Sequence, residues 1–137
     1  MSDFVIEDDV LRKYTGESEK VIIPNGIDSI GGLAFYGNNR LKEVVIPDGV
    51  TVIDVNAFAS CTNLVKVSIP DGVKCIAHWS FCECSSLSSI NIPKSVVFIG
   101  DWAFRGCSSL KEIVLPRKDI TIGMEVFDED TKVTYAE

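Results

Sequence analysis

The sequence predicts a parallel β solenoid, a fold in which short strands from successive turns of one coil stack side by side. Three observations predict it: similar residues recur at a fixed interval, apolar residues alternate within each interval, and a proline follows each alternating stretch. Repeats of roughly 20 to 50 residues are typical of solenoids. The chain has 137 residues, 46% of them hydrophobic, which suits one domain of about 100 to 200 residues.

The recurring interval is 23 residues long. Every proline of the chain lies on it, at Pro24, Pro47, Pro70, Pro93 and Pro116. A phenylalanine column holds Phe35, Phe58, Phe81, Phe104 and Phe127, and an isoleucine column holds Ile30, Ile53, Ile76, Ile99 and Ile122. A leucine column holds Leu41, Leu64, Leu87 and Leu110, with Val133 expected in the same place at the end. So many matching columns indicate an internal repeat whose units stack.

Each repeat begins with a predicted strand, which the second unit illustrates. Val44 and Ile46 are expected to face the interior and Val45 the solvent, since alternate side chains of a strand point to opposite faces. Proline has no amide hydrogen to donate to a sheet, so Pro47 is expected to end the strand. The Asp48-Gly49 pair that follows is typical of a turn.

The remainder of each unit is predicted to return the chain to the next strand. Ala57-Phe58, followed by small residues, favours a short helical or 3₁₀ turn on the convex side. One unit cannot bury its own apolar edge, but stacked units share a continuous core. A buried phenylalanine contributes about 1.5 to 3 kcal/mol, so the phenylalanine column is expected to supply much of the stability.

Charge divides the chain into three predicted regions. Residues 1–20 hold six acidic and three basic residues, 21–117 hold eight of each, and 118–137 hold six acidic and two basic residues. We expect 21–117 to be the repeat array, 1–20 to form a hairpin that caps it, and 118–137 to be an irregular last repeat and C-terminal cap. Caps are expected because exposed terminal strands template edge-to-edge pairing.

Composition limits the classes of partner. The net charge of -7 and the lack of a basic cluster argue against a nucleic-acid partner. No apolar run approaches the roughly 18 residues of a membrane span, which argues against membrane insertion. The start of the chain lacks a secretory signal. A complete chain is therefore expected in the cytoplasm, and a trimmed piece of an exported protein at the cell surface or secreted.

One motif is clearest in two places: VVIPDGVTVIDVNAFASCTNL from Val44 to Leu64 and INIPKSVVFIGDWAFRGCSSL from Ile90 to Leu110. It resembles the repeat of the BspA-like leucine-rich repeat proteins, a 23-residue class common among bacterial surface proteins. The resemblance implies a right-handed parallel β coil with short strands on its concave face. It also implies binding of proteins or host surfaces, with adhesion the best-known use, and no catalysis.

Three of the five cysteines share one column of the repeat. Cys61, Cys84 and Cys107 lie on the interval, with Asn38 and Asp130 expected in the same column at its two ends. Free cysteine is among the most often buried residue types. Disulfides need paired geometry, and an odd number of cysteines leaves one over. The column therefore favours buried free thiols.

Four possible zinc ligands also lie within ten residues: Cys75, His78, Cys82 and Cys84. Thiolates and imidazoles are the ligands that zinc prefers. The repeat argues against a site, because Cys84 belongs to an inward column, whereas Cys75 and His78 lie in columns of mixed chemistry that are typical of a surface. No metal and no other cofactor is expected.

His78, the only histidine, would have to carry ordinary acid-base catalysis. Asp101 lies one repeat later and is expected beside it, at about the 5 Å strand spacing. With a cysteine nearby, the pair could be interpreted as a nucleophilic triad, but a surface ion pair is simpler and no enzyme activity is expected.

Trp79 and Trp102, also one repeat apart, are either a stacking platform for a sugar or partner side chain or packed beside the turn.

The exposed face of the strands is the predicted partner-binding surface. Its two outward columns are Lys20, Glu43, Lys66, Ser89 and Glu112, and Ile22, Val45, Ser68, Asn91 and Val114. Both columns vary while their neighbours stay fixed, so the fold constrains them little. The charges of Lys20, Glu43 and Lys66 alternate in sign and can pair across strands. This mixed strip predicts a module that binds a protein or peptide, with a structural spacer of a longer bacterial surface protein as the alternative.

Overall fold

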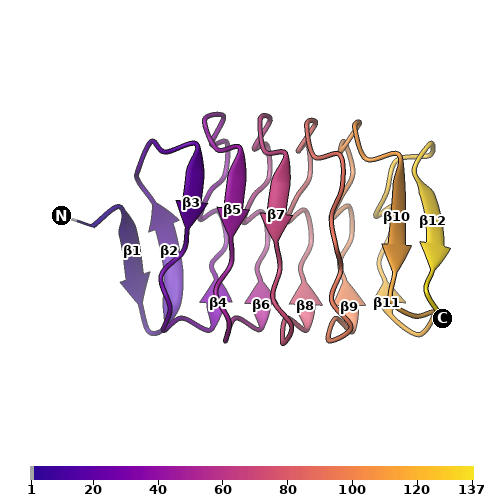
Figure 1. Cartoon of the computed structure of the whole chain (residues 1–137), viewed down its shortest axis with the longest axis horizontal. Helices are drawn as coiled ribbons and strands as arrows, with labels where there is room; N and C mark the ends of the chain where they lie inside the picture. The colour runs from indigo at the N-terminus through magenta and orange to yellow at the C-terminus, as the bar shows by residue number, and fades with distance from the viewer. Residues whose placement is uncertain (1) are drawn as a thin grey trace.

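The structure, a computed structural model, describes residues 2–137 and shows a parallel β solenoid of about five turns (Figure 1). The coil runs along the long dimension of the molecule, and the two ends of the chain lie at opposite ends of it. The predicted solenoid is confirmed. The turns of the coil stack through three hydrogen-bond ladders, two made by strands and one made by tight turns, and one of the strand ladders is interrupted once.

The first ladder forms the face that we call the concave strand face. Its strands are β3 (Lys20–Ile22), β5 (Glu43–Val45), β7 (Lys66–Ser68), β10 (Glu112–Leu115) and β12 (Lys132–Tyr135). They pair in parallel as one sheet of β3, β5 and β7 and a second sheet of β10 and β12. Val44 is fully buried between its half-exposed neighbours Glu43 and Val45, and β5 ends shortly before Pro47, as the alternation predicts.

The second ladder is a seven-stranded sheet, and beyond the hairpin strands β1 and β2 the sequence pattern did not reveal its members as strands. Its members, in order, are β1 (Phe4–Glu7), β2 (Val10–Tyr14), β4 (Ser29–Ile30), β6 (Val52–Ile53), β8 (Cys75–Ile76), β9 (Phe98–Ile99) and β11 (Thr121–Ile122). From β4 onward each strand ends in a residue of the isoleucine column, and all of these are buried except Ile122. The isoleucine column was therefore the feature of the sequence that could have predicted this sheet.

The convex side carries hydrogen-bonded turns, and residues 2–137 contain no helix, which corrects the expected helical or 3₁₀ turn. The amides of Ala57 and Ala59 donate to carbonyls three residues earlier, whereas those of Asn56, Phe58 and Ser60 donate to the next turn of the coil. Asn56 and Ser60 adopt positive φ angles of 59° and 60°, which aim alternate peptides at the neighbouring coil. A helix would use all of these amides internally.

The core between the ladders is a column of stacked phenyl rings. Consecutive rings of the phenylalanine column have centroids 4.8, 5.2, 5.3 and 5.7 Å apart and lie within 13° of parallel. Four of the five are buried, and Phe127 is partly buried. Tyr14 extends the stack, with its ring 5.1 Å from that of Phe35. It escaped prediction because it lies 21 residues before Phe35 instead of 23.

The N-terminal end carries an antiparallel hairpin of β1 and β2. Asp8 and Asp9 connect the strands with φ angles of 53° and 62°, a left-handed conformation that aspartate adopts more readily than most residues. Because β2 also pairs in parallel with β4, the hairpin covers β4, the first strand of this sheet that ends in the isoleucine column. Met1 lies outside the described residues, and the proposed borders of cap and array at 20 and 117 stay a prediction.

The last turn of the coil differs from the prediction in register. β12 pairs with β10 in parallel over four residues. Lys132 faces Glu112, an offset of 20 residues instead of 23, because this turn is shorter. Val133 consequently pairs with Ile113 and belongs to the strand column, not to the leucine column. Asp130 is exposed and lies outside the buried cysteine column.

Candidate functional site

All ten residues of the predicted partner surface lie on the concave strand face, and none is buried. Lys20, Ile22, Lys66, Ser89, Asn91, Glu112 and Val114 are exposed, and Glu43, Val45 and Ser68 are half-exposed. The apolar side chains of Ile22 and Val114 are 66% and 55% exposed. The surface is thus an open strip of mixed charge with apolar positions at both ends.

The charges on this strip pair only in part. Lys20 Nζ lies 3.8 Å from Glu43 Oε2 on the neighbouring strand, which confirms the predicted cross-strand pairing at this position. Lys66 also faces Glu43 in register, but within residues 2–137 its ammonium forms no ion pair. An exposed pair of this kind contributes little to stability, about 0 to 1 kcal/mol. Lys66 therefore remains available to an acidic group of a partner.

The concave strand face is interrupted at 89–91, where a fourth strand was predicted. Across residues 2–137, the structure shows no main-chain hydrogen bond made by residues 88–92, so this segment pairs neither with β7 nor with β10. Asn91 stands where Val45 and Val114 stand in other turns, and asparagine is depleted in strands. Serine and asparagine side chains also compete with a sheet for nearby backbone groups. The prediction of a continuous ladder is corrected here.

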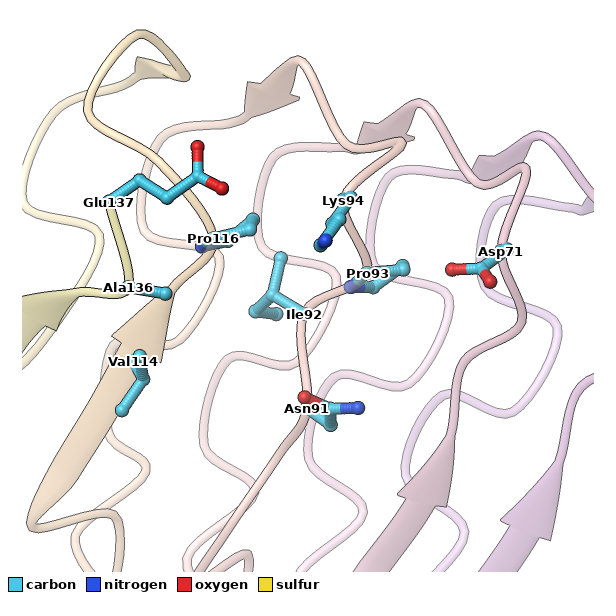
Figure 2. Close-up of a pocket in the computed structure, with 9 residues that line it drawn as sticks. All are labelled: Asp71, Asn91, Ile92, Pro93, Lys94, Val114, Pro116, Ala136 and Glu137. Carbon is cyan, nitrogen blue, oxygen red and sulfur yellow. The ribbon is translucent and has the colours of Figure 1, made fainter.

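Three grooves border the interrupted segment. We use the name strand gap for residues 88–92 together with these three grooves. One of about 290 Å³ lies between β7 and the segment, and one of about 340 Å³ lies between the segment and β10. The largest, about 550 Å³, lies where these strands end. Figure 2 shows it between Asn91, Ile92 and Pro93 on one side and Val114, Pro116 and Ala136 on the other.

The buried cysteine column is confirmed, and all five cysteines are free thiols. Cys61, Cys84 and Cys107 each donate a hydrogen bond, with S···O distances of 3.1 Å, to the carbonyl of a phenylalanine in the preceding turn. The hydrogen bond with Cys61, together with burial, raises the pKa of Cys84. Burial raises the pKa of Cys107 to about 12. These thiols hold neighbouring turns together and are poor nucleophiles.

The four residues considered as zinc ligands do not converge. Cys84 is buried in the interior column, whereas Cys75, His78 and Cys82 are half-exposed. No group of three or more possible metal ligands comes together in the part of the chain that the structure describes. Burial is the main cause that raises the pKa of the Cys75 and Cys82 thiols above the ordinary value, so both are weakly ionised at neutral pH.

His78 and Asp101 are neighbours, as their spacing predicts. His78 Nδ1 accepts a hydrogen bond from the Asp101 amide at 2.8 Å and lies 3.7 Å from Asp101 Oδ2. Asp101 Oδ1 in turn accepts from the Met124 amide, also at 2.8 Å. Each side chain thus holds the amide of the next turn of the coil. This is a structural role, and it occupies the imidazole nitrogen that faces the carboxylate.

Trp79 and Trp102 stack on each other on the convex side. Their ring centroids are 5.0 Å apart and the rings lie 11° from parallel; Trp79 is 39% exposed and Trp102 is half-buried. Both residues have positive φ angles, 54° and 55°, as do the residues at this position in the other turns. Since each ring covers one face of the other, only the outer faces remain to stack a ligand.

Parallel strands at 23-residue spacing, fixed interior columns and an open strand face define this protein as a leucine-rich repeat solenoid. A family model described as BspA type leucine rich repeat region matches residues 5–134 in six copies. The chain belongs to this family, which confirms the resemblance. Among residues 2–137, no helix has the length and hydrophobicity needed to span a bilayer.

Three solved structures of bacterial leucine-rich repeat proteins are similar to this chain. The T. pallidum protein shares 32% identity over 88% of this chain, with a TM-score of 0.82. The Bacteroides ovatus protein shares 32% identity over 98%, with a TM-score of 0.80. A leucine rich cell surface protein of Faecalibacterium prausnitzii shares 28% identity over 93%, with a TM-score of 0.78. The chain covers 60%, 39% and 35% of these proteins, respectively. A comparison with curated proteins gives no match.

Proposed function

We propose that this chain is a non-enzymatic interaction module that binds a protein or peptide partner on its concave strand face. One observation carries the proposal: on the same strands, the inward column is always valine or isoleucine, whereas the outward columns change chemistry from turn to turn. Packing explains the inward residues but not the outward ones. Repeat proteins present such faces to their partners.

The chemistry of the strip suits a protein surface. Exposed Ile22 and Val114 offer apolar contact, and Lys66 and Glu112 offer charges of opposite sign. An anionic polymer would need a basic strip, which this face lacks. The Faecalibacterium prausnitzii relative is described as a cell surface protein. We extend that setting to this chain and propose a role in adhesion.

The test compares partner capture by variants of the immobilised protein. Reversing charge with Glu43→Lys and Lys66→Glu, or adding bulk with Val45→Trp and Asn91→Trp, is expected to reduce capture at least about tenfold, as for loss of about 1.4 kcal/mol. Lys74→Glu is the matched control, because Lys74 is exposed beside the second ladder. It is expected to capture normally. Circular dichroism confirms that each variant folds.

A structural spacer is the second candidate. It is favoured by the continuous stacked core, which makes a stiff rod, and by the fact that the chain covers only 60% or less of the three solved relatives described above. A spacer would tolerate every change on the strand face. If capture survives the charge reversals and the bulky substitutions alike, the concave-face proposal fails and the spacer replaces it.

A further inference from the structure

The strand gap leaves main-chain donors and acceptors open in the middle of a sheet. In the intact turns, the Ile23 amide donates to the Val45 carbonyl and the Ile46 amide to the Ser68 carbonyl, both at 3.1 Å. The corresponding amides of Ile69 and Ile92 make no such bond in the described chain. The edges of β7 and β10 that face this segment are unpaired as well, because β7 pairs only with β5 and β10 only with β12. Unpaired strand edges are templates for another extended chain.

Apolar burial is also incomplete at this place. Val44 and Ile113 are fully or almost fully buried in the inward column, but Ile90, in the same column, is only partly buried. Ile69 is only partly buried too, although Ile46 one turn earlier is 3% exposed. Covering these two side chains would remove apolar surface from water, which favours an occupant.

We propose that the strand gap binds an extended segment of a partner protein through main-chain hydrogen bonds to residues 88–92. This inference rests on the proposed function and names the place and the mode of binding. Only an extended polypeptide offers alternating amides and carbonyls at the spacing of a strand. Addition of such a strand to an open sheet gives affinity through the backbone and specificity through alternate side chains.

The largest groove defines the chemistry of the segment. Its floor is apolar, with Ile92, Val114 and Pro116, and its charged residues are Asp71, Lys94 and Glu137. Two carboxylates against one ammonium leave a net negative charge at the end where the strands finish. The complementary segment therefore alternates apolar residues and carries a basic residue at this end.

The first experiment examines the free protein by amide hydrogen exchange. Paired amides of a sheet exchange slowly, and unpaired exposed amides exchange fast. Amides of residues 88–92 are expected to exchange much faster than those of 42–46, which occupy the same positions two turns earlier. Equal protection of the two segments would show that the ladder is closed in solution, and the proposal would be overturned.

The second experiment titrates an acetylated peptide of sequence Val-Thr-Val-Thr-Val-Lys into the full chain. Running parallel to the neighbouring strands, it would bring its lysine to Asp71 and Glu137. We expect saturable binding with protection of the 88–92 amides. Binding should weaken at least about tenfold when alternate peptide amides are N-methylated, since several hydrogen bonds are lost. A lysine-to-glutamate peptide should also bind more weakly. Absence of saturable binding, or equal binding of the N-methylated peptide, would overturn the proposal.

The matched variant is Ser89→Glu with Asn91→Val, which gives this turn the Glu-Ile-Val sequence of residues 112–114. Both changed side chains are exposed, so the fold is expected to survive. The variant should protect its 88–92 amides and lose peptide binding. If it binds the peptide as the wild type does, the proposal fails. If it still captures a partner that the Glu43 and Lys66 variants lose, the strand gap is excluded while the proposed function stands.

Discussion

The stack of phenyl rings makes a quantitative prediction at Phe81. This side chain is fully buried and lies between two rings, with centroids 5.2 and 5.3 Å away, whereas Phe127 is partly buried and has one neighbour at 5.7 Å. Burial of a phenylalanine contributes about 1.5 to 3 kcal/mol, and each aromatic pair adds about 0.5 to 1.5 kcal/mol. Phe81→Ala should therefore lower the free energy of unfolding by about 4 kcal/mol, and Phe127→Ala by about half as much.

The assay is equilibrium unfolding in urea, followed by circular dichroism and by the fluorescence of Trp79 and Trp102, which lie in the central turns. At this chain length, a loss of 1 kcal/mol lowers the melting temperature by about 3 °C, so the two variants should differ by about 6 °C. The stacked core would not be the main source of stability if Phe81→Ala cost no more than Phe127→Ala. A loss at Phe81 below about 1 kcal/mol would refute the reasoning altogether.

Three further predictions concern contacts between neighbouring turns. Because burial raises the pKa of Cys107 from 9.0 to about 12, the native state holds a proton that the unfolded state releases above pH 9. The free energy of unfolding should then fall with rising pH, by about 1.4 kcal/mol per pH unit. In urea titrations at several pH values, Cys107→Val should show a shallower fall. An unchanged slope of the free energy against pH would contradict this prediction. Gly100→Ala should lower the free energy of unfolding by about 1 to 3 kcal/mol, since the new Cβ would lie 2.5 Å from the His78 amide nitrogen. Gly32→Ala, whose Cβ would have its nearest atom at 3.2 Å, should lower it much less. The reverse order of stability in thermal melts would contradict this prediction. His78→Ala removes the acceptor of the Asp101 amide and should lower stability by about 1 kcal/mol, with partial rescue by His78→Asn; partner capture should not change, and its loss would argue for a direct role of the imidazole.

The repeat made the overall architecture predictable, because each interior column reports one position of the coil several times. The second strand ladder was harder to recognise, since its strands are very short. Val52 and Ile53, for example, form a strand of only two residues, and it pairs with strands of other turns, not with a segment adjacent in the sequence. The last turn was misaligned because a shortening of three residues shifts Val133 into another column without changing its apolar character.

The outward positions of the concave strand face were predictable from strand alternation, but the interruption within it was not. Ile90 keeps the inward apolar residue, and Pro93 keeps the strand stop, so the pattern of this turn matches the others. This turn differs from the paired turns in its outward residues, Ser89 and Asn91, and asparagine has a low strand propensity. Such differences depend on context and are easily outweighed by the packing of neighbouring turns.

The interruption affects only one of the three ladders, and this determines how the rod can deform. On both sides of the fourth turn, the second ladder stays paired through β8, β9 and β11, and the tight turns stay bonded from Phe81 to Ala103 and from Phe104 to Val126. If the rod bends, those two unbroken seams are expected to serve as the axis. Bending would then be confined to this one turn, while the phenyl column would remain continuous.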